Sequence, residues 1–170
     1  SCWIKVSDVS KTNSIIDKFF DGADRSYSLR LQSSRIRFYL AIADGSNSNY
    51  YQSSATFNND TWYHIVATFD SSGAANKQVK IYVNGDLDSE HGKTDLISTN
   101  VMNPRIGTGY SNPPSNYFGG DIDEVAIWNR TLELTDVQRI YNATANNPGK
   151  TANLFTAGLN TGLAYWNRMG

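Results

Sequence analysis

Short β-rich segments recur through the first 107 positions of this sequence, and they constrain the fold more than any other feature. They lie at residues 3–6, 14–20, 27–31, 36–42, 50–55, 61–70, 78–83, 86–90 and 104–107. In several of them apolar and polar residues alternate, which places one face of a strand against a core. Asn84 and Gly85 form the strongest turn signal, because both residues tolerate positive φ. Many strands at this spacing predict a β-sandwich or barrel.

Residues 118–141 combine a strand, a turn and a helix. Between Asp121 and Trp128 apolar residues fall on both faces of an extended chain, which indicates a strand that is covered on both sides. Thr135 and Gln138 have the spacing of a capping box. Apolar residues then follow at helical spacing at Val137, Ile140 and Tyr141. The predicted helix is short, so it depends on packing against the rest of the protein.

Composition excludes several classes of protein. The 170 residues suffice for one domain with a hydrophobic core. A net charge of −1 and the lack of any run of Lys and Arg argue against nucleic-acid binding. No apolar stretch is long enough to span a membrane, so we expect no membrane insertion. Cys2 is the single cysteine, which rules out an internal disulfide.

A set of motifs occurs in a characteristic order along the chain. They are TWYHIVATFD at 61–70, VKIYVNG at 79–85, RIG at 105–107, FGGDIDEV at 118–125, NRTL at 129–132 and the helix at 135–141. In this order they resemble the laminin G-like, pentraxin-like branch of the concanavalin A-like lectin/glucanase superfamily. The resemblance extends over about residues 3–141, which is most of the chain.

The resemblance implies an all-β fold: a two-sheet antiparallel jelly-roll sandwich with one short helix near the C-terminal end. It also implies an extracellular or surface-exposed module, either secreted or carried on a cell or virion. Its partners would be a glycan or a surface protein, together with neighbouring domains of a larger chain.

The family pattern also suggests boundaries. We assign residues 1–145 to a laminin G-like jelly-roll domain whose opening strands are missing, and 146–170 to a linker and a further strand. Because residues 162–170 resemble the start of another such domain, we infer a tandem array of repeats. Residues 163–169 either fold back into the slot of the absent first strand, at small loop-closure cost, or are disordered or pair with the next repeat.

The resemblance points to Ca²⁺ as a possible cofactor of such a domain. Asp121 and Asp123 share one parity of a strand, so their carboxylates could converge, and hard oxygen ligands suit Ca²⁺. In the alternative interpretation, Asp123 accepts backbone N–H bonds and Glu124 pairs with an arginine such as Arg105.

A carbohydrate site needs aromatic faces together with polar groups that fix hydroxyls. The candidate carbohydrate-binding residues lie in expected loops at one rim and are Tyr50, Tyr51, Tyr110, Asn112 and Tyr117. Ordinary loop packing explains these tyrosines equally well. Three tryptophans have apolar neighbours, and we expect them in the core: Trp3, Trp62 and Trp128.

Catalytic motifs are absent from the sequence. Glucanases of the superfamily use two carboxylates in a Glu-x-Asp-x-x-Glu pattern, and residues 121–124 lack that spacing. His64 and His91 have no Ser or Cys nucleophile motif beside them. Two histidines and one cysteine leave no zinc-ligand cluster. We therefore predict no enzymatic activity.

The sequence thus predicts a non-catalytic extracellular module that binds glycans through rim loops. The alternative is a structural or adhesive repeat of a surface, phage or viral fibre protein, with no small ligand. A degenerate catalytic domain is a third and minor reading.

Overall fold

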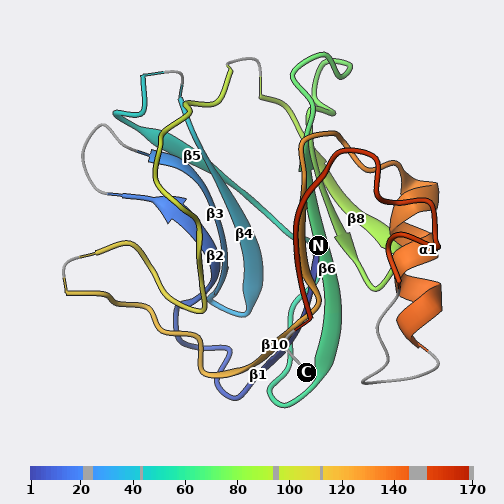
Figure 1. The fold of residues 1–170 in the computed structure, drawn as a ribbon. Helices are drawn as coiled ribbons and strands as arrows, with labels where there is room; N and C mark the ends of the chain where they lie inside the picture. Colours follow the sequence, from blue (N-terminus) through green and yellow to red (C-terminus); the bar gives the residue numbers. More distant parts are fainter. Residues whose placement is uncertain (21–24, 43, 94–95, 112, 146–152, 169–170) are drawn as a thin grey trace.

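The computed structural model describes residues 1–20, 25–42, 44–93, 96–111, 113–145 and 153–168. Two five-stranded antiparallel sheets face each other, and the helix packs on the outer face of one of them (Figure 1). The predicted jelly-roll sandwich is confirmed.

We call the sheet beneath the helix the helix-side sheet. Its strands, in spatial order, are β10 (Gly120–Asp123), β1 (Cys2–Val6), β6 (Trp62–Phe69), β7 (Val79–Val83) and β8 (Asp86–His91). The second sheet has the order β5 (Ser48–Gln52), β4 (Arg35–Ala41), β3 (Arg25–Gln32), β2 (Asn13–Phe19) and β9 (Arg105–Ile106). The remaining elements are β11 (Val125–Trp128), α1 (Leu134–Ala145) and β12 (Leu163–Asn167).

The core lies between the two sheets and follows from the alternation in the sequence. On β3 and β4, every second residue points inward and is buried: Leu29, Leu31, Ile36, Phe38 and Leu40. The residues between them point outward and cover the opposite face of the second sheet. This outer face has no helix over it in Figure 1.

A second apolar cluster joins α1 to the helix-side sheet. Val137 and Ile140 of α1 pack with Val66 and Tyr82 of that sheet. β11 contributes to both clusters. Val125 packs in the core between the sheets, and Ala126 and Trp128 pack in the cluster beneath α1. Covering on both faces is therefore confirmed for β11, but the strand predicted from Asp121 to Trp128 is interrupted at Glu124, whose φ is 52°.

The turn between β7 and β8 explains how closely the helix approaches. Asn84 and Gly85 both have positive φ, at 51° and 86°, as the sequence predicts. A Cβ added at Gly85 would lie 2.7 Å from Cδ1 of Tyr141 on α1. Glycine is thus needed both for the turn and for the contact with the helix.

The predicted helix cap is wrong by two residues. α1 begins at Leu134, so Thr135 lies within the first turn rather than before it. The Glu133 carbonyl accepts from the Val137 amide, and the Glu133 amide donates to Asp136 Oδ2 at 3.4 Å. Asp136 therefore takes the role expected of Gln138, because the helix starts two residues earlier than the capping box predicted.

The C-terminal segment pairs with the body of this domain. β12 runs antiparallel to β11, with Ala126 opposite Trp166 and Ile127 opposite Tyr165. On its other side β11 exchanges two backbone hydrogen bonds with Ser1. The division into 1–145 and 146–170 stays a prediction, and residues 146–152 lie outside the described residues.

Candidate functional site

The two adjacent tyrosines of the predicted site lie on strand β5, and the strand separates them. Tyr50 points outward and is 50% exposed. Tyr51 packs against the core between the sheets, with its ring 5.6 Å from the His91 ring. Successive side chains of a strand point to opposite faces, so the pair cannot contact one ligand together.

The other predicted residues are distributed between the surface and the interior. Tyr110 is only 8% exposed, and its hydroxyl donates to the Asn103 carbonyl at 2.6 Å. Tyr117 is 65% exposed, and Asn112 lies outside the described residues. The Tyr110 amide donates a hydrogen bond to Asp17 Oδ2 on β2, which is three strands from β5. Because neighbouring strands lie nearly 5 Å apart, Tyr110 and Tyr50 are separated by about 14 Å across the sheet.

Strand register gathers a different set of side chains around Tyr50. Two neighbouring rows cross the second sheet: Asp17, Ser28, Tyr39 and Tyr50 in one, and Ser14, Arg30, Arg37 and Gln52 in the other. We call the outer surface formed by Phe19, Arg30, Arg37, Tyr39 and Tyr50 the arginine–aromatic face.

Rings and guanidinium groups alternate on this face. Arg30 Cζ lies 5.6 Å from the Phe19 ring centroid and 5.1 Å from that of Tyr39. Arg37 Cζ lies 4.7 Å from the Tyr50 centroid, and the Tyr39 and Tyr50 rings are 5.5 Å apart. Each guanidinium over a ring is held by a cation–π contact, which leaves its N–H groups able to donate elsewhere.

The two arginines differ in how their charges are compensated. Arg30 donates from Nη2 to Asp17 Oδ2 at 3.0 Å and from Nε to Ser28 Oγ at 2.7 Å. Burial raises the pKa of Asp17, although Arg30 and the Tyr110 amide oppose this shift. Arg37 has neither a carboxylate nor a hydrogen-bond acceptor among the described residues, and its Nε is buried without a partner.

Sequence reasoning found Tyr50 but missed its neighbours on the arginine–aromatic face. The signal was present in the alternation of residues 27–31 and 36–42. In that pattern Arg30, Arg37 and Tyr39 occupy the outward parity of a predicted hairpin. A large aromatic residue at an outward position, beside two arginines, could have marked this face as a site.

The two carboxylates predicted to bind Ca²⁺ lie on β10, at the edge of the helix-side sheet. Asp121 Oδ2 is 2.6 Å from Lys5 Nζ, and Asp123 Oδ1 accepts from the Glu124 amide at 2.8 Å. The described part of the chain has no cluster of three or more His, Cys, Asp or Glu able to hold a metal ion. This donor set fits Ca²⁺ poorly, since one carboxylate is already ion-paired. Calcium binding stays a prediction.

Glu124 does not pair with Arg105, so that expectation was wrong. Its Oε2 accepts a hydrogen bond from Trp166 Nε1 of β12 at 2.8 Å. Burial raises the pKa of Glu124. Arg105 instead lies on the second sheet, with its guanidinium 3.8 Å from the Tyr110 ring centroid. The pairing of β12 with β11 brings in a partner 42 residues away, which local sequence could not indicate.

The tryptophans depart from expectation in one case. Trp62 is 37% exposed on the outer face of the helix-side sheet, beside Lys5, and not in the core. It shares this face with His64, which Tyr141 of α1 covers at a ring distance of 5.9 Å. Trp3 and Trp128 are partly buried.

One hydrogen bond superficially resembles a catalytic pair. Ser1 Oγ and His64 Nε2 are 2.9 Å apart. His64 is fully buried, however, and burial lowers its pKa to about 3. Its Nδ1 has no partner in the described structure, so no carboxylate orients the ring. The pair lacks both access and the third group that a nucleophile–base system needs.

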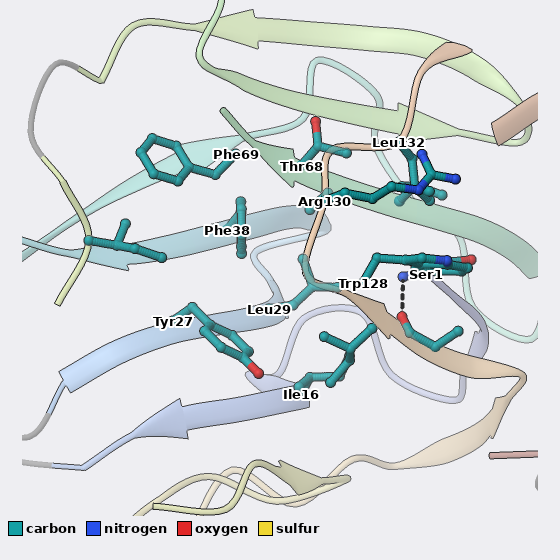
Figure 2. Close-up of a pocket in the computed structure, with 15 residues that line it drawn as sticks. Ser1, Ile16, Tyr27, Leu29, Phe38, Thr68, Phe69, Trp128, Arg130 and Leu132 are labelled. Atoms are coloured by element: carbon teal, nitrogen blue, oxygen red, sulfur yellow. Dashed lines mark hydrogen bonds between the residues drawn. The ribbon is translucent and has the colours of Figure 1, made fainter. Parts of the chain in front are cut away.

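A cavity of about 220 Å³ lies between the sheets (Figure 2). Its lining is mostly apolar, with Leu29 and Phe38 on one side and Phe69 and Trp128 on the other. The buried Thr68 hydroxyl that lines it has no hydrogen-bond partner in the described part of the chain. Ligand pockets usually exceed about 300 Å³ and present several polar groups, so this space suits a sugar less well than the arginine–aromatic face.

No helix in the described residues is long and apolar enough to cross a membrane.

Comparisons with solved structures show the same architecture. The chain aligns with a candidate carbohydrate binding protein from Bacteroides ovatus ATCC 8483 at 20% identity and a TM-score of 0.68. The alignment covers 98% of this chain but 43% of that protein, so the chain spans less than half of its length.

Two further structures extend this comparison. A native heptameric SAP-like pentraxin from Limulus polyphemus aligns at 18% identity and a TM-score of 0.61, over 89% of this chain and 72% of the pentraxin. Domain 4 of AbnA, a GH43 extracellular arabinanase from Geobacillus stearothermophilus solved with arabinotriose, aligns at 18% identity and a TM-score of 0.56, over 81% and 62%.

Comparison of the sequence identifies a family but no individual curated relative. No curated protein matches the chain. A family model described as the concanavalin A-like lectin/glucanases superfamily matches residues 1–138.

Proposed function

Since the chain belongs to the concanavalin A-like lectin/glucanase superfamily, as its ordered motifs predicted, we propose that it is a non-catalytic module that binds carbohydrate through the arginine–aromatic face. The observation that carries the proposal is the half-exposed ring of Tyr50, held beside Tyr39 and Arg37 on a sheet face that no helix covers. Sugar rings pack their apolar faces against aromatic rings while nearby polar groups fix the hydroxyls.

The sheet face replaces the rim loops as the proposed site for a physical reason. Tyr110 is buried and its hydroxyl is already bonded, and Tyr51 faces the core. Tyr50 keeps the role given to it. Tyr117 is exposed, but the Asn116 carbonyl beside it accepts from the Ser14 amide of β2, three strands from the β5 strand that carries Tyr50. Amide side chains for hydroxyl groups are available at Gln32, which accepts from Tyr39, and at Gln52.

The face offers no machinery for hydrolysis. Its carboxylate, Asp17, is buried and ion-paired with Arg30, whereas glycoside hydrolysis needs a second carboxylate at a fixed separation. The candidate Bacteroides protein and the arabinanase domain support a carbohydrate-binding role, and we propose an extracellular or surface location by the same analogy.

Affinity electrophoresis against a panel of soluble polysaccharides tests the proposal, followed by titration calorimetry on any that bind. Tyr50→Ala should weaken binding about tenfold, as expected for the loss of one aromatic contact worth about 1.4 kcal/mol. Tyr165→Ala is the matched control, because Tyr165 is also exposed but lies on β12.

Two results would contradict the proposal: binding that Tyr50→Ala leaves intact, and a panel with no binding at all. The second result would favour the structural or adhesive repeat, which contacts only neighbouring domains.

A further inference from the structure

The geometry points to an acidic polysaccharide as the ligand of the arginine–aromatic face, with Arg37 as the residue that contacts the anionic group. The shared chemistry is a sugar ring that carries a carboxylate or a sulfate. This inference rests on the proposed carbohydrate-binding function and names the class of sugar.

The first argument is the segregation of charge in the fold. The strands of the second sheet carry six cationic side chains and one carboxylate, a net charge of +5, whereas the whole chain has a net charge of −1. The cationic residues are Lys18, Arg25, Arg30, Arg35, Arg37 and Arg105, and the carboxylate is Asp17. A positive sheet in a weakly acidic protein attracts anions to one side of the molecule.

The second argument is the placement of two positive charges directly opposite each other. Arg30 and Arg37 are cross-strand partners on β3 and β4. Like charges at such positions destabilise a sheet. Asp17 neutralises Arg30, but the described residues supply no anion for Arg37. A bound carboxylate or sulfate would neutralise Arg37 in the same way and so compensate both charges of the pair.

The third argument is the preorganisation of Arg37. Its guanidinium lies 4.7 Å from the Tyr50 ring centroid, so its position is set by stacking and not by hydrogen bonds. Its Nε is buried, but its Nη groups make no hydrogen bond among the described residues, and guanidinium groups match carboxylate and sulfate oxygens well. A ligand that packs a ring on Tyr50 would present its acidic substituent to Arg37.

Matched pairs of polymers that differ only in charge test this inference. We would measure binding of the full chain to polygalacturonate and to its methyl-esterified form, and to dextran sulfate and dextran. The charged member of at least one pair should bind, and its affinity should fall as NaCl is raised from 50 to 500 mM, as screening requires (Debye length about 10 Å at 0.1 M). The pair that responds distinguishes carboxylate from sulfate.

Arg37→Gln should weaken binding of the charged polymer about tenfold or more. Because Arg37 makes no ion pair in the described structure, this variant should fold, and an unchanged melting temperature verifies it. Arg139→Gln is the control, because it removes the same charge from an exposed position on α1, which packs on the helix-side sheet. This variant should bind the charged polymer as the wild type does.

The outcomes separate this inference from the proposed function. Equal binding of charged and uncharged polymers, or full binding by Arg37→Gln, would overturn the acidic class and leave carbohydrate binding intact. Failure to bind any acidic or neutral polysaccharide would remove both. Tighter binding to single-stranded DNA than to every polysaccharide would also overturn the inference, since it would indicate a general polyanion surface.

Discussion

Replacing Arg30 by glutamine should destabilise the protein by about 3 kcal/mol at pH 7, because it leaves a buried carboxylate without its counter-charge. Asp17 is 0% exposed and its Oδ2 lies 3.0 Å from Arg30 Nη2. Its other oxygen, Oδ1, is already buried without a hydrogen-bond partner among the residues that the structure describes. After the substitution, the Tyr110 amide at 3.2 Å would still donate to Oδ2.

The magnitude follows from the burial of the two partners. Breaking a fully buried ion pair by removing one partner costs about 3–5 kcal/mol. The Arg30 side chain is 18% exposed, so water screens part of the interaction. We therefore expect the lower end of this range, about 3 kcal/mol.

The effect should depend on pH with a definite sign. Burial already raises the folded-state pKa of Asp17 in the wild type, so this group favours folding most below its ordinary pKa of about 4. That contribution is lost as pH rises through the raised pKa. Without Arg30 the pKa rises further, so the deficit of the variant should be smaller at pH 4.5 than at pH 7.

Urea denaturation at both pH values measures these differences from the midpoint and slope. The double variant Asp17→Asn/Arg30→Gln should recover at least about 1 kcal/mol relative to Arg30→Gln alone, because no buried charge remains. A cost below about 1 kcal/mol at pH 7, or an equal cost at both pH values, would refute the assignment of Asp17 as a buried charge that depends on Arg30.

Five further predictions test other parts of the structure. His64, with its pKa lowered to about 3, must stay neutral in the fold, so the wild type should lose about 2 kcal/mol between pH 6.5 and 5, and His64→Gln should abolish this loss in denaturation curves. Trp166→Phe removes the donor to the Glu124 carboxylate and should cost about 1–2 kcal/mol. Trp62→Phe replaces an exposed side chain and should change the free energy of unfolding little. Deletion of residues 163–170 should lower the Tm, and an unchanged Tm would contradict a stabilising role for β12. Calcium binding at the β10 carboxylates predicts a Tm that rises in millimolar Ca²⁺ and falls back with EDTA; no shift would count against it.

The outer faces of the sheets show where sequence reasoning reached its limit. Tyr50 was identified as a candidate because it follows a polar loop. Its partners Arg37 and Tyr39 were not, since only the register between β4 and β5 makes them neighbours. Tyr110 looked equally exposed in sequence, yet the fold buries it over Asp17. Exposure and proximity on a sheet depend on which strands pair, and that pairing is a non-local property.

The sequence by itself determined the features that arise within a few residues. Alternation marked the strands, Asn84 and Gly85 marked a hairpin turn, and apolar residues on both parities marked β11 as covered on both sides. These are local properties, because side-chain direction follows a period of two and turn conformation follows from the φ preferences of two residues.

Only the tertiary structure decided the features that join distant segments. It set Arg30 against Arg37 and bound Asp17 to Arg30. It also placed β12 beside β11, so that Trp166 reaches Glu124. The physical reason is that strand register and sheet order are set by packing of the whole core, which no local pattern specifies.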